Sequence, residues 1–179
     1  MGYNLPVYDT QKISLGPGVI YLGPVGSTPS TDVGAVRSGM NFAITRTKVP
    51  VKQGNPATNI KTFVTEEAGV LTLTGLEWNL DNFAMALGQT TTSVGNTLDV
   101  GGDMNIHEVA IKLVHVNPNG HTYTLYIWKA EPRGDLTINL TDEPHAFEMA
   151  FEAMLTTVDW AGNSLSAGEQ MFKLFRQTS

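Results

Sequence analysis

Glycine and proline interrupt this sequence so often that a long helix fits into very little of it. The chain has 179 residues, among them 18 glycines and nine prolines, and short apolar runs lie between these residues. Threonine, a β-branched residue that suits half-exposed strands, occurs 21 times. Short apolar segments bounded by turn residues are typical of β-sandwiches and β-barrels. We therefore expect a mainly β fold with a single domain.

Several kinds of chemistry lack the residues that they need. Cysteine is absent, which excludes disulfides, thiolate metal sites and a cysteine nucleophile. The four histidines lack metal-ligand spacing, and we find no phosphate-binding loop and no serine-nucleophile motif. Residues 1–15 lack the regions of a signal peptide, and no apolar run is long enough to cross a membrane. We expect a protein that is not an enzyme, holds no cofactor or metal and does not enter a membrane.

The segment 80–87 is the best candidate for a helix. Asp81 or Asn82 can cap its start, and Gly88 can end it. Its apolar stripe follows the spacing i, i+3, i+4, i+7 and consists of Leu80, Phe83, Ala84 and Leu87. Strands are predicted at 19–22, 60–68, 70–79, 106–116, 123–130, 136–140 and 171–175, with a hairpin turn at 117–120.

The segment 145–158 fits a helix stripe and a strand alternation equally well. Its Ala, Glu and Met residues favour a helix, whereas Asp-Glu-Pro before it and Thr-Thr-Val after it favour a bounded strand. We predict a strand. On that strand Glu148 and Glu152 share one face with Ala146 and Ala150, so this face is small and acidic.

Charge is sparse and unevenly placed. Charged residues make up 16% of the chain, well below the roughly 25% of an ordinary domain. Residues 1–65 carry six basic and two acidic groups, whereas residues 66–169 carry three basic and 15 acidic groups. The segment 48–59 has no apolar period and is predicted to be a long loop. Such a basic loop is either simply solvated or complementary to the acidic body of another copy.

Four segments, taken in their order and spacing, carry a resemblance to a known family. They are GVLTLTGLEWNLDNFAMALG, YTLYIWKAEP, DEPHAFEMAFEAML and MFKLF. Together they resemble the major tail tube proteins of long-tailed (siphovirus-type) bacteriophages. Residues 1–17 and 89–105 lie outside the resemblance.

The resemblance implies a fold and an assembly. The fold is a β-sandwich or partial barrel of two packed antiparallel sheets, with one short flanking helix and long loops. Residues 1–17 would form an N-terminal arm and residues 18–179 the tail-tube domain. Homohexameric rings would stack into the hollow tail tube of the virion after assembly in the host bacterial cytoplasm. Double-stranded DNA would pass through without specific binding, and the tape measure, tail terminator and baseplate or distal tail proteins would be further partners.

The resemblance also suggests roles for particular residues. Residues 46–62 would form a protruding loop that contacts the neighbouring ring. Its basic residues are Arg46, Lys48, Lys52 and Lys61, and the candidate acidic partners are Glu66 and Glu67. Glu148 and Glu152 would face the lumen, where negative charge repels DNA phosphates.

Three alternatives stay open from the sequence. Tube proteins of contractile tails and of type VI secretion share the family fold. A β-sandwich binding module, such as a phage adhesin or a carbohydrate-binding domain, would need an exposed aromatic platform, for which Trp128 and Trp160 are the candidates. A small enzyme would need a pocket with perturbed titratable groups.

Overall fold

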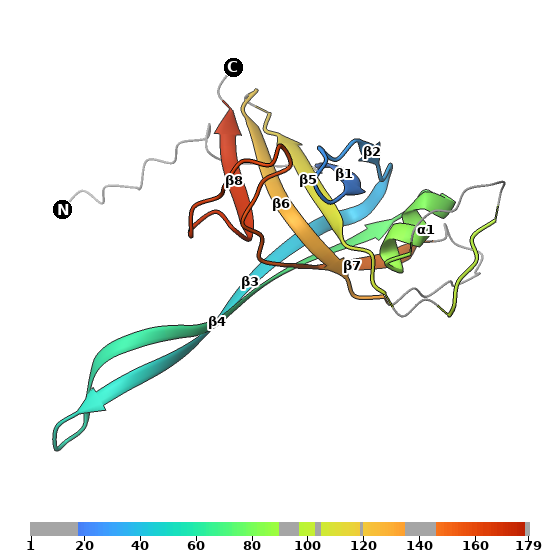
Figure 1. Cartoon of the computed structure of the whole chain (residues 1–179). Helices are drawn as coiled ribbons and strands as arrows, with labels where there is room; N and C mark the ends of the chain where they lie inside the picture. Colours follow the sequence, from blue (N-terminus) through green and yellow to red (C-terminus); the bar gives the residue numbers. More distant parts are fainter. Residues whose placement is uncertain (1–17, 90–96, 103–104, 119, 135–145, 178–179) are drawn as a thin grey trace.

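The computed structural model describes residues 18–89, 97–102, 105–118, 120–134 and 146–177 (Figure 1). The fold is mainly β with a single short helix among these residues, as the sequence predicts. The elements are β1 (Val19–Pro24), β2 (Thr31–Asp32), β3 (Val36–Gln53), β4 (Thr58–Gly75), α1 (Leu80–Ala86), β5 (Val109–Val116), β6 (Thr122–Pro132), β7 (Phe147–Ala153) and β8 (Phe172–Gln177). The expected N-terminal arm, residues 1–17, and the strand expected at 136–140 lie outside the described residues.

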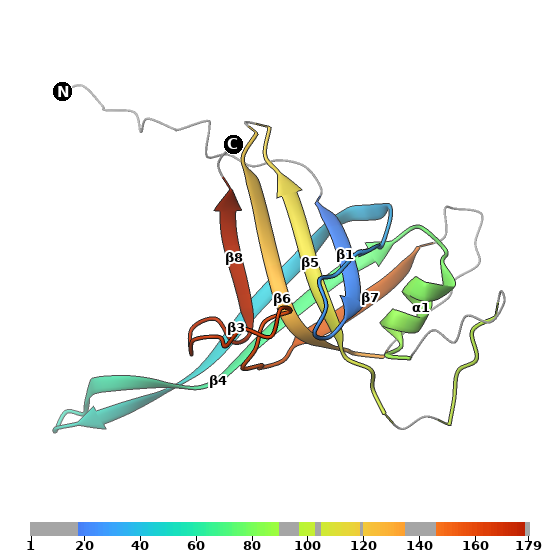
Figure 2. The same ribbon diagram turned by 45° about the horizontal axis from the view of Figure 1, so that its top comes forward.

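The strands form two layers that belong to one hydrogen-bonded sheet. The strand order is β2-β1-β5-β6-β7-β4-β3, and β8 pairs with β6. Most of β6 pairs with β5 and β8, and only its last three residues pair with β7. The sheet therefore turns at the end of β6, and β7, β4 and β3 cross the other layer (Figure 2). The two expected sheets are thus continuous with each other.

The core lies between these layers, and β7 shows how the sequence builds it. Phe147, Met149, Phe151 and Ala153 are all at most 5% exposed, while the residues between them are partly or fully exposed. β7 pairs with β4 along its whole length. The prediction of a strand at this segment is confirmed. Helix propensity is overridden because alternate burial against a sheet suits only a strand.

The helix prediction is confirmed, with one correction at its start. Asn79 is the N-cap, and its side chain accepts a hydrogen bond from the Asp81 amide, so neither Asp81 nor Asn82 has that role. Gly88 ends the helix with a φ of 66°, a conformation that favours glycine. Leu80, expected in the buried stripe, is 38% exposed, because the buried face is formed by Asn82, Phe83, Ala84 and Ala86.

The predicted long loop at 48–59 is wrong. β3 continues to Gln53 and β4 starts at Thr58, so only residues 54–57 form the turn. Pro50 fits this ribbon because a two-stranded ribbon has free edges, where a missing N–H breaks no ladder.

The two strands predicted at 60–68 and 70–79 are one strand, β4. Gly69 lies within it, opposite Ile44 and Ala153. A Cβ at this position would lie 3.1 Å from the Phe42 ring, so the glycine makes room for an aromatic side chain rather than ending a strand.

Candidate functional site

The most exposed part of the described structure is a long hairpin arm, which we define as residues 44–67 of β3, β4 and their turn. The arm projects well beyond both layers (Figure 1), and every residue in it is exposed. It nevertheless carries large apolar side chains that are 41–59% exposed, namely Val49, Val51, Ile60, Phe63 and Val64. An isolated two-stranded ribbon is marginally stable in water. These apolar groups therefore suit a surface that another molecule covers.

The predicted basic residues divide into two groups along the arm. At the root, Arg46 forms an ion pair with Glu67 at 2.7 Å, and the Thr47 hydroxyl donates to Glu66 at 3.2 Å. Both candidate acidic partners are therefore satisfied within the same hairpin. This follows from strand register, which places Arg46 opposite Glu67 and Thr47 opposite Glu66.

The three lysines nearer the tip have a different environment. Lys48 and Lys52 form no ion pair within the described residues, and the Lys61 ammonium lies 4.6 Å from the centre of the Phe63 ring. Residues 48–65 contain no acidic group. The arm tip is thus both cationic and apolar.

The two glutamates predicted to face a lumen lie on the outer face of β7. Glu148 is exposed, and Glu152 forms an ion pair with Arg133 at 3.2 Å. Their neighbours on β4 are Thr74 opposite Glu148 and Val70 opposite Glu152. This face therefore carries mainly small side chains and little charge. Among the described residues, Glu148 has no cationic partner on it.

A second region that sequence patterns do not single out surrounds the start of α1. We call it the α1 surface and define it by Asp32, Glu77, Trp78, Leu80 and Asp81. Trp78 is 44% exposed although one side of its ring packs against Phe83. Glu77 accepts a hydrogen bond from the Ala35 amide, which joins this segment to the β2–β3 connection. The sequence signal there is the alternation of polar and apolar residues from 77 to 81, with acidic groups at both ends.

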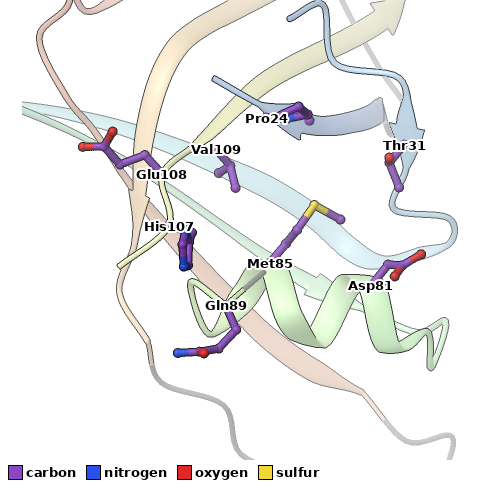
Figure 3. Close-up of a pocket in the computed structure, with 9 residues that line it drawn as sticks. Pro24, Thr31, Asp81, Met85, Gln89, His107, Glu108 and Val109 are labelled. Carbon is purple, nitrogen blue, oxygen red and sulfur yellow. The ribbon is translucent and has the colours of Figure 1, made fainter. Parts of the chain in front are cut away.

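A hollow of about 440 Å³ lies beside this surface (Figure 3). Its lining residues are Gly23, Pro24, Thr31, Asp81, Met85, Gln89, His107, Glu108 and Val109. Glu108 forms an ion pair with Lys129 at 2.7 Å. No group of three or more potential metal ligands occurs within the described residues.

Within the described residues, the carboxylates with a clear pKa shift are Asp159 and Glu169, which lie away from that hollow in the loop between β7 and β8. A hydrogen bond from the Asn163 side chain lowers the pKa of Asp159, and a hydrogen bond from Lys173 lowers the pKa of Glu169. Both carboxylates are partly exposed; Asp159 bonds within the loop, and Glu169 joins the loop to β8 through Lys173.

Of the two tryptophans considered for a sugar platform, Trp128 lies on β6 beneath that same loop, and Trp160 is part of the loop. Trp128 is 6% exposed, and its indole N–H donates to the Glu169 carbonyl at 2.8 Å. The Trp160 ring lies 4.4 Å from that of Tyr126 and 5.0 Å from that of Trp128. These rings form a small second core that holds the loop on β6. A flat exposed platform is not available at Trp128.

No protein-family model matches the sequence, and no curated protein matches it. Within the described residues, no helix has the length and apolar character to cross a membrane.

Proposed function

We propose that this protein is the structural subunit of a hollow tail tube, in which copies close into hexameric rings and the rings stack. The observation that carries the proposal is the arm. It exposes apolar side chains on an unsupported ribbon, and a second copy of the chain can cover them.

The arm also favours a contact that repeats. Its cationic, apolar tip differs from the acidic body, so the tip of one copy fits a different surface on the next copy. Such heterologous contacts produce rings when they close and filaments when they do not. Two independent contacts of this type are sufficient for stacked rings.

The outer face of β7 and β4 suits the inner wall of such a tube. Glu148 supplies negative charge there, while Thr72 and Ala150 supply small side chains that offer little to grip. A wall of this kind repels the phosphates of DNA and lets the duplex pass. The resemblance to phage tail tube proteins supports the same role. On this proposal the protein belongs to a virion tail, with the tape measure, terminator and distal tail proteins as its further partners.

Negative-stain electron microscopy of the purified full chain tests this function over a range of protein and salt concentrations. We expect rings or hollow tubes whose lumen admits one DNA duplex. We also expect stacking to weaken at high salt, because the lysines of the arm are exposed. A protein that stays monomeric at every concentration would contradict the proposal.

A further inference from the structure

We infer that the tip of the arm docks on the α1 surface of the next copy. This inference rests on the proposed self-assembly and adds the partner surface. An occupant for the tip must offer negative charge to Lys48, Lys52 and Lys61, and apolar groups to Phe63 and its neighbours.

The α1 surface offers both. Asp32, Glu77 and Asp81 form no ion pair within the described residues, although backbone amides donate to Asp32 and Glu77. Trp78 and Leu80 lie between Glu77 and Asp81 in the sequence and are 44% and 38% exposed. The hollow beside Asp81 gives room for an incoming side chain.

Four other acidic residues suit the arm less well. Lys129, Arg133 and Lys173 already neutralise Glu108, Glu152 and Glu169, at 2.7 to 3.2 Å. Glu148 has no such cation among the described residues, but its neighbours on the sheet, Thr74 and Ala150, are small, so they offer little apolar surface to Phe63. Charge and apolar surface coincide at the start of α1.

Topology prevents the arm from reaching this surface in its own chain. The α1 surface flanks the start of β3 and follows the end of β4, where the Leu76 amide donates to the Ala35 carbonyl. The tip lies at the other end of both strands. Each strand has 18 residues, which corresponds to roughly 60 Å at 3.3 Å per residue. The contact is therefore between copies, head to tail, and it can repeat without limit.

The absence of native cysteine allows a direct test. One full-length variant carries Thr58→Cys at the arm tip, and a second carries Leu80→Cys on the α1 surface. The two are mixed, assembled and treated with a short bis-maleimide. We expect a crosslinked dimer in the mixture and none with either variant alone. A chain that carries both cysteines should give a ladder of covalent oligomers.

A matched control places the second cysteine elsewhere on the body, as Thr72→Cys on the exposed face of β4. We expect little crosslinking between Thr58→Cys and Thr72→Cys. Tubes that form but crosslink at Thr72 and not at Leu80 would overturn the docking site and leave the proposed function intact. A protein that forms neither rings nor tubes would overturn both.

Discussion

β3 and β4 run through both the body and the arm, but their apolar side chains are buried only in the body. In the body, β4 pairs on both sides, and Leu71 and Leu73 are at most 3% exposed. In the arm, β3 and β4 pair only with each other, and Phe63 is 48% exposed. Burial of apolar side chains accounts for the stability of the body. The arm exposes large apolar residues that no other described part of the chain covers. A partner that covers them would account for their exposure, which is why we connect the arm with assembly.

The largest expected difference separates two phenylalanines. Phe151→Ala empties a fully buried site in the body and should lower the free energy of unfolding by about 3–5 kcal/mol. Phe63→Ala removes an exposed ring and should change it by less than about 0.5 kcal/mol. Urea unfolding of the unassembled protein measures both. Equal losses would contradict the division into body and arm.

Gly75 provides a second test of how tightly the body is packed. A Cβ at this position would lie 2.7 Å from the ring of Phe147, which is itself buried. Gly75→Ala should therefore cost about 1–3 kcal/mol through overpacking. Gly54→Ala is not a suitable control, because Gly54 has a φ of 99°. Thr62→Ala in the arm is better matched and should be nearly neutral. A neutral Gly75→Ala would show that the core yields easily at this place.

A smaller effect is expected at the root of the arm. The Arg46–Glu67 pair is exposed, so Arg46→Ala should lower the free energy of unfolding by about 0–1 kcal/mol. The loss should shrink further in high salt, because salt screens exposed charges. Thermal unfolding in low and high salt measures this. A loss that is large and independent of salt would mean that Arg46 contributes by packing rather than by charge.

The smallest expected effect is on the pH dependence of stability, through the loop between β7 and β8. The pKa of Asp159 is lowered below its ordinary value of 3.8 by the hydrogen bond from Asn163. The stability that this carboxylate contributes is therefore present above pH 3.8 and is lost as the pH falls through the lower value in the folded protein. Asp159→Asn should reduce the difference in stability between mildly and strongly acidic solution. Tryptophan fluorescence during acid titration measures it, and an unchanged titration would contradict the role of Asp159.

Sequence patterns predict the parts of the fold that a core organises. The alternation in β7 and the turn between β5 and β6 are correct because burial and turn chemistry are local signals. The end of α1 at Gly88 is also correct, because a positive φ selects glycine. The extent of the arm is not visible in the same way. The β4 half of the arm is largely predicted, as the strand at 60–68. The facing part of β3 is missed, because both of its faces lie in solvent and no alternation marks it.

The candidate site is predicted only in part. The sequence identifies the basic residues and their isolation from acid. It cannot show that Arg46 and Glu67 neutralise each other. These two residues are 21 positions apart in the sequence, and only the register between β3 and β4 places them opposite each other. The sequence does not indicate that Trp128 is buried, because the loop that covers it has no regular apolar period.

Removing the arm tests the central claim most directly. Replacing residues 48–65 with Asn-Gly, which favours a tight hairpin turn, joins Thr47 to Glu66 across their existing pairing. We expect the shortened protein to unfold at nearly the same temperature as the full chain and to form no tubes under the electron microscope. A shortened protein that keeps its fold and still assembles into tubes as readily as the full chain would contradict the account.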